Sequence, residues 1–162
     1  MRALPSGRLD KRVIASWRVG RAIWTGILSL VLIASAALAW ALLPELVNAG
    51  WVLAAVALSL LVVGVFVVAV PQIRYMTWRY EVTDDEIDIF KGVLVHTRVI
   101  IPLVRVQHVN TSQGPILRAF GLATVSVSTA AGEQEIPGLS VEDADKLRDR
   151  VAVLARLAQE DV

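Results

Sequence analysis

The chain has no cysteine and only two histidines among its 162 residues. The lack of cysteine excludes disulfide bonds, thiolate metal sites and a cysteine nucleophile. Neither His96 nor His108 has an acidic residue or a second histidine at metal-ligand spacing, so we expect both to be ordinary strand residues. The sequence therefore predicts no metal site.

Catalytic motifs are missing as well. Ser126 and Ser128 have neither a nearby base nor the glycines of a nucleophile elbow. The chain also has no glycine-rich loop of the kind that holds phosphates. We therefore expect no catalytic residues, no cofactor, no small-molecule substrate and no enzymatic activity.

Ionisable residues are absent from two long apolar stretches, residues 22–43 and 51–70. At about 1.5 Å of rise per residue, each stretch forms a helix of roughly 30 Å, which matches a bilayer's hydrocarbon core. Residues 22–71 are thus predicted to form a transmembrane hairpin with a short loop at 44–50. Because intramembrane ionisable groups mark ion and proton paths, their absence argues against a transporter or proton relay.

Aromatic residues are scarce but gather near the ends of the predicted spans. Trp24, Trp40 and Trp51 lie near helix ends, and Tyr75 and Trp78 follow the second span. Amphipathic rings are enriched at the headgroup level of membranes. We therefore interpret all five as membrane-interface anchors.

Positive charge is concentrated at the N-terminus. Residues 1–21 carry six basic groups against one acidic group, whereas the predicted loop carries only Glu45. The positive-inside rule then places both termini in the cytoplasm. Two interpretations of the basic segment 1–21 stay open: an interfacial helix with Leu9, Val13 and Trp17 on its apolar side, or a disordered tail that only sets orientation.

Apolar and polar residues alternate from Thr77 onward, which is typical of half-buried strands. Turn residues divide this region into about six short strands, including one over residues 93–101 and a last one over 133–136, ended by Pro137-Gly138. Ser140 then begins a helix, with Asp143 in the capping-box position. Its apolar face is formed by Val141, Ala144, Leu147, Val151, Leu154 and Ala158.

The predicted fold is thus a transmembrane helical hairpin followed by a bent β-sheet or β-sandwich with a C-terminal helix. On the strand near residue 125, Thr124, Ser126 and Ser128 form a hydroxyl row that we expect to be exposed. Together with the sheet edges, this row is a candidate surface for a protein partner.

Three segments of the predicted domain form a recognisable pattern: residues 101–107 (IPLVRVQ), 113–122 (QGPILRAFGL) and 128–132 (STAAG). Together they resemble the signature of the bacterial PH-like membrane proteins of the YdbS type. The resemblance implies two transmembrane helices and one cytoplasmic PH-like domain, here residues 72–162, in the bacterial inner membrane. In this family a multi-domain relative of the YdbT type is often encoded alongside, and the biochemical activity is poorly defined.

The signature contains three candidate contact residues for a lipid headgroup or a partner: Arg105, Gln107 and Arg118. Arg105 and Gln107 are two residues apart and share a face, and Arg118 lies close before Gly121. Gly121 is expected to adopt a backbone conformation that other residues disfavour. The alternative is that both arginines tie loops to the sheet with their planar donor groups.

The charge of residues 72–162 argues against strong binding of phosphate groups by this region. This region has 10 basic and 13 acidic residues, and its first expected hairpin turn is Asp84-Asp85-Glu86. Nucleic-acid binding requires a basic patch, which is missing.

Two functions remain for a chain attached to the lipid bilayer. The first is a membrane-anchored interaction module that binds a protein partner at the cytoplasmic face, in an assembly with a related PH-like protein or with itself. The second is a module that responds to lipid headgroups through Arg105 and Arg118.

Overall fold

A computed structural model of the protein describes residues 3–42 and 49–160. The chain forms two compact units. One is Trp17–Gln72, and the other joins Met1–Ser16 with Ile73–Val162. The first sixteen residues therefore group with the C-terminal part of the chain.

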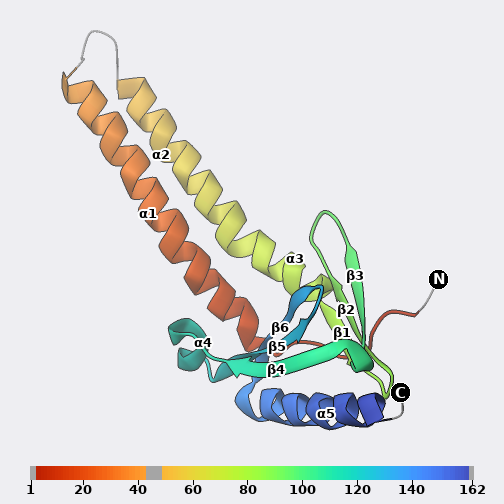
Figure 1. Cartoon of the computed structure of the whole chain (residues 1–162). Helices are drawn as coiled ribbons and strands as arrows, with labels where there is room; N and C mark the ends of the chain where they lie inside the picture. The colour runs from red at the N-terminus through yellow and green to blue at the C-terminus, as the bar shows by residue number, and fades with distance from the viewer. Residues whose placement is uncertain (1–2, 43–48, 161–162) are drawn as a thin grey trace. The chain divides into compact units, whose positions relative to one another are not determined.

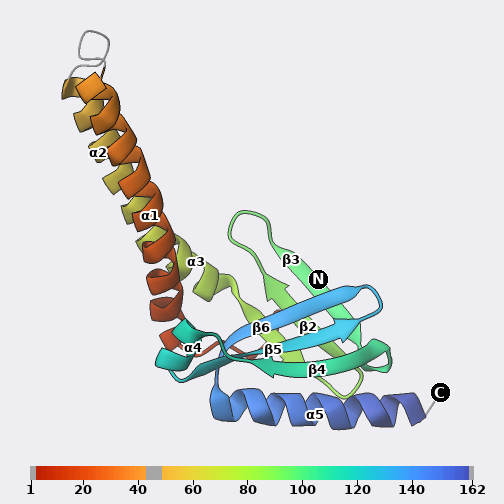
Figure 2. The same ribbon diagram turned by 60° about the vertical axis from the view of Figure 1, so that its left-hand side comes forward.

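The Trp17–Gln72 unit is a helical hairpin. Helix α1 is Arg12–Leu42, and the return helix runs from Ala49 to Thr77 as α2 (Ala49–Gly64), a π-helical turn (Val65–Ala69) and α3 (Val70–Thr77). Within this unit α1 and α2 run antiparallel and side by side (Figures 1 and 2). Both helices are long and apolar enough to cross a membrane. Most of the predicted loop, residues 43–48, lies outside the described residues.

The surface of the hairpin is apolar. Leu53, Leu60 and Leu61 are each more than 60% exposed, whereas the hydroxyl-bearing Ser59 is 5% exposed and donates to the Val56 carbonyl at 2.8 Å. Monomeric soluble proteins do not expose apolar surface on this scale. Outward leucines with a small residue on the packed face are typical of membrane helices.

A proline explains the π-helical turn. The ring of Pro71 would clash with the carbonyl group four residues earlier in a regular α-helix, and that residue, Val67, lies inside the turn. The wider π geometry accommodates this site without ending the helix.

The second unit contains two antiparallel sheets of three strands each, ordered β1-β2-β3 and β4-β5-β6. The first sheet consists of β1 (Arg79–Val82), β2 (Glu86–Lys91) and β3 (Thr97–Pro102). The second consists of β4 (Val106–Ser112), β5 (Leu122–Thr129) and β6 (Gly132–Ser140). The connections include a 3-10 turn, η2 (Leu103–Arg105), and a short helix, α4 (Pro115–Ala119).

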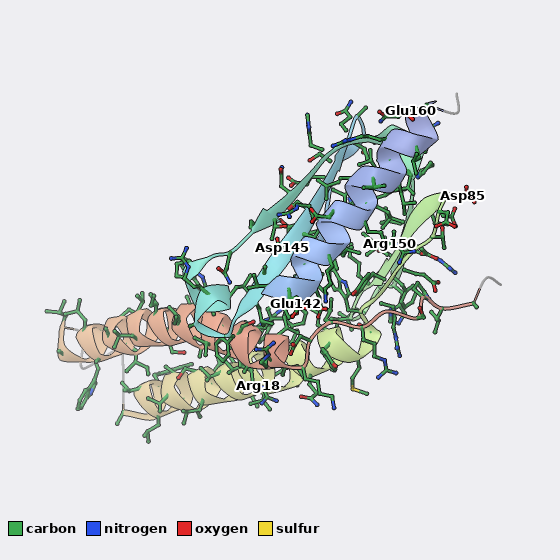
Figure 3. All side chains as sticks on the ribbon, turned by 90° about the horizontal axis from the view of Figure 1, so that it is seen from below. Arg18, Asp85, Glu142, Asp145, Arg150 and Glu160 are labelled. Carbon is green, nitrogen blue, oxygen red and sulfur yellow. The ribbon has the colours of Figure 1, made fainter. Side chains whose placement is uncertain are left out.

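Helix α5 (Val141–Glu160) packs along η2 and the second sheet, and Figure 3 shows it in front of that sheet with Glu142, Asp145 and Arg150 along it. The predicted cap is confirmed, since the Ser140 hydroxyl accepts the Asp143 N–H at 3.1 Å. The core draws on both sheets and α5, and includes the fully buried Ile87, Ile89, Leu103, Val127, Ile136 and Val151.

Two strand boundaries differ from the prediction. Strand β3 begins at Thr97 rather than at residue 93, because residues 92–96 form a loop. Strand β6 continues through Pro137-Gly138 to Ser140, where we expected it to end. Gly138 has a φ of +67°, which a glycine adopts without penalty, so the strand bends instead of stopping.

The hydroxyl row was wrongly predicted to be exposed. Thr124 and Ser126 are 7% and 6% exposed. They lie on β5, the central strand of its sheet, and all residues from Leu122 to Val127 are buried. Both faces of β5 are therefore covered from Leu122 to Val127, and only Ser128 of the predicted row is partly exposed, so the row is not a docking surface.

Candidate functional site

The N-terminal strap, residues 3–11, joins the outer strands of the two sheets. Gly7 and Tyr80 of β1 form a bridge, with N–H···O distances of 2.9 and 3.1 Å. Three residues later, the Asp10 N–H donates to the carbonyl of Gly138 on β6 at 3.0 Å. The strap thus closes the seam between β1 and β6.

Apolar anchors hold the strap in place. Leu9 and Val13 are 4% and 0% exposed, and Val13 packs on Gly138. Segment 1–21 was predicted to be an interfacial helix or a disordered tail. In the structure α1 begins only at Arg12, and Leu9 and Val13 of the predicted apolar side are buried in the second unit, so these two side chains do not face lipid.

Charged groups fix both ends of the strap. Arg98 donates to the buried carboxylate of Asp88 at 2.5 Å and to the Ala3 carbonyl at 2.9 Å. At the other end, Asp10 accepts the Arg12 N–H at 2.8 Å, which caps α1. The hydrogen bond from the Arg12 side chain lowers the pKa of Asp10.

The strap also changes the charge balance. All basic residues except Arg18 and Arg21, and all acidic residues except Glu45, belong to the second unit. That makes fourteen of each sign, so the unit is neutral rather than acidic.

The opposite edges of the two sheets, β3 and β4, border an open groove. In the described residues each of these strands pairs on one side only. The groove has a volume of about 950 Å³ and is bounded by β3, η2, the start of β4, the β5–β6 turn and the end of α5. The Gln159 side chain donates to the Val106 carbonyl at 3.1 Å and so fixes the end of α5 beside it.

The groove combines an apolar floor with polar neighbours. Ile100 and Val104 are 43% and 41% exposed, and Arg105, Gln107 and His108 lie beside them. A register irregularity between Val106 and His108 places Gln107 on a bulge. Bulges redirect side chains and interrupt pairing at strand edges. None of the described residues that line the groove is acidic.

The structure brings together two of the three predicted contact residues. Arg105, at the end of the η2 turn, and Gln107, at the register irregularity, both line the groove. Arg118 is exposed on α4, beyond the far end of β4. The seven residues of β4 extend about 23 Å at 3.3 Å per residue, so one headgroup cannot contact both arginines.

Neither arginine side chain ties a loop to the sheet in the described residues, since no side-chain hydrogen bond or ion pair of Arg105 or Arg118 is present there. Gly121 has a φ of +65°, which confirms the predicted left-handed conformation. Ile100, Val104 and His108 are further groove residues that were not predicted from the sequence. The exposure of these side chains depends on which strands pair with each other, and the alternation of apolar and polar residues does not show that.

The predicted interface anchors separate into two groups. Trp24, Trp40 and Trp51 are 75%, 48% and 64% exposed, and Tyr75 is partly exposed. Trp78 differs from the expectation, because it is 5% exposed within the second unit.

Histidine and carboxylate groups do not cluster. Within residues 3–42 and 49–160, no three His, Asp or Glu side chains gather as a metal site would need. His96 stacks on Phe90 with ring centroids 5.4 Å apart, and the acidic turn around Asp85 is exposed (Figure 3).

An apolar helical hairpin followed by two small antiparallel sheets and a C-terminal helix defines a membrane protein with a PH-like domain. The chain belongs to the bacterial PH domain family, whose model matches residues 12–155. It is 44% identical over the full length of both chains to "UPF0699 transmembrane protein YdbS" of Bacillus subtilis (strain 168).

A second relative comes from the same organism. "UPF0699 transmembrane protein YdbT" is 31% identical over 99 residues, which are 59% of this chain and 20% of that protein. No solved structure matches the chain.

Proposed function

We propose that the chain is a non-catalytic, membrane-anchored module whose PH-like domain binds an extended segment of a protein partner in the open groove. The partner is a related PH-like membrane protein, and the two form an assembly at the cytoplasmic face of the bacterial inner membrane.

The observation that carries this proposal is a difference between the two places where the sheets meet: the β1–β6 side is closed and the β3–β4 side is open. The chain closes the β1–β6 seam with its own N-terminal strap, whereas β3 and β4 have unpaired outer edges beside a groove. Exposed strand edges accept another strand through main-chain hydrogen bonds, and neighbouring pockets select its side chains.

The chemistry of the groove indicates the kind of segment. Ile100 and Val104 offer apolar contact, and Arg105 offers a cation that is unpaired in the described residues. We therefore expect a segment in which apolar residues flank an acidic one, since Arg forms paired hydrogen bonds with carboxylates.

Two further observations support the partner and its location. The related proteins named YdbS and YdbT occur together in one organism. The basic residues of the first 21 positions, against a single acidic residue in segment 43–50, favour cytoplasmic termini.

The test is the native mass of the full-length protein, extracted gently from its host membranes, with mass spectrometry of the proteins that migrate with it. We expect a larger assembly that contains a second PH-like protein. Arg105→Glu should release this partner, whereas Asp149→Lys, on the exposed surface of α5, should retain it.

A single chain without partner would contradict the proposal, as would a partner retained by both Arg105→Glu and Val104→Asp. The alternative is a headgroup site at Arg105. It predicts a single chain with bound anionic lipid, and loss of that lipid in Arg105→Glu.

A further inference from the structure

The loop between β2 and β3, residues 92–96, presents large apolar side chains at its tip. Leu94 is 94% exposed and Val95 is 77% exposed, the two highest values among the exposed large apolar residues described. Alternation predicted a strand here, and a strand would have buried half of these side chains. In the folded unit they contact almost nothing.

The base of this loop is firmly held. Gly92 has a φ of +141°, and a Cβ there would lie 2.8 Å from the carbonyl carbon of Val95, so only glycine fits the tight fold of the loop. Phe90 and His96 stack across the base. The apolar tip is therefore displayed by a defined structure.

The base is also attached to the end of the membrane-crossing helix. The Thr77 hydroxyl, in the last residue of α3, donates to the carbonyl of Gly92. Thr77 follows the last residue of the apolar run, Val70, by seven helical residues, or about 10 Å. Leu94 is two residues from Gly92, at most about 7 Å away.

These lengths allow the tip to reach the bilayer surface. With about 7 Å for the Thr77–Gly92 link, Leu94 lies within roughly 25 Å of the last apolar residue of the span, where the headgroup layer, about 5–8 Å thick, begins. Cations flank the base: Arg74 lies 5.1 Å from the centroid of the Trp78 ring, and Lys91 lies 5.7 Å from it and also donates to the Gln134 side chain at 2.9 Å. Such groups are attracted to the anionic lipids of the cytoplasmic leaflet.

We propose that the β2–β3 loop is a membrane-insertion wedge: Leu94 and Val95 enter the interface of the same bilayer that holds the hairpin, and Arg74 and Lys91 face its anionic headgroups. The wedge would give the PH-like domain a second attachment beside the covalent one. The proposed insertion does not require a protein partner in the open groove, so it can be tested independently of the proposed function.

The lack of cysteine allows a direct test with the full-length protein. Leu94→Cys and, separately, Val95→Cys carry a polarity-sensitive fluorophore in vesicles of phosphatidylethanolamine and phosphatidylglycerol. The matched control is Asp84→Cys, in the exposed β1–β2 turn of the same sheet. We expect blue-shifted emission at 94 and 95, quenching by nitroxides on the lipid acyl chains, and little quenching by aqueous iodide, with the reverse at 84.

Two results would overturn the proposal. Iodide quenching at 94 and 95 equal to that at 84 would show that the loop is in water. Protection from iodide without quenching by lipid nitroxides would show that protein, rather than lipid, covers the tip.

Discussion

Gly138→Ala tests whether the N-terminal strap is an integral part of the domain. Gly138 lies on β6 with a φ of +67°, and a Cβ there would lie 2.5 Å from the Cβ of Val13. The backbone strain costs about 1–2 kcal/mol. The overpacking costs about 1–3 kcal/mol. We expect a loss of about 2–5 kcal/mol in unfolding free energy, unless Val13 and the strap leave their site.

The matched control is Gly121→Ala. Gly121 has nearly the same φ, +65°, but a Cβ there would meet only the flexible end of Arg12 at 3.4 Å. It should therefore lose only the strain of about 1–2 kcal/mol. The difference between the two variants isolates the contact between Val13 and β6.

The assay combines denaturant unfolding of the full-length protein in one detergent with trypsin cleavage after Arg8 and Lys11. Gly138→Ala should be less stable than Gly121→Ala and should be cut faster at the strap, because a displaced strap exposes its backbone. Equal stability and equal cleavage in the two variants would refute the packing of Val13 against Gly138.

Three further predictions concern single groups of the domain. Ser140→Ala should destabilise the protein by about 1 kcal/mol in denaturant unfolding, because it removes the N-cap of α5, whereas Ser112→Ala at an exposed site should not. Burial, aided by Asp143, raises the pKa of Tyr80, so one of the two tyrosines should ionise above pH 10 in an absorbance titration, and Tyr80→Phe should abolish that phase. The hydrogen bond from Arg12 lowers the pKa of Asp10. The ionised Asp10 carboxylate therefore stabilises the fold above about pH 4, and this stabilisation is lost as the pH falls further. The unfolding free energy of Asp10→Asn should fall less on acidification than that of the unchanged protein.

The hairpin and most of the strands could be predicted because their signals are local. Two uninterrupted apolar stretches specify membrane helices by length alone. The C-terminal helix follows from its cap and its apolar period, and Ala144 and Val151 of the predicted face are indeed buried.

The strap could not be predicted because its partners are distant in the sequence. Leu9 and Val13 looked like one side of an amphipathic helix, whereas the backbone around them bonds Tyr80 and Gly138, which lie more than sixty residues away. Trp78 was misread for the same reason: its position after the second span fits an interface anchor, but it is covered within the domain.

The groove shows how far the candidate site could be predicted. Arg105 and Gln107 are only two residues apart, so their common place beside the groove could be expected from the sequence. Arg118 was wrongly grouped with them, because β4 runs away from the groove and α4 lies beyond its far end. The exposed hydroxyl row failed because alternation cannot tell a central strand, covered on both faces, from an edge strand.

The proposed function requires the open groove to hold a segment of a related PH-like protein. The most direct measurement is cross-linking in native membranes from a single cysteine at Gln107, compared with one at Asp149 on the exposed surface of α5. We expect a cross-linked product from Gln107→Cys that contains a second PH-like membrane protein, and none from Asp149→Cys. No product from position 107, or the same products from both positions, would contradict it.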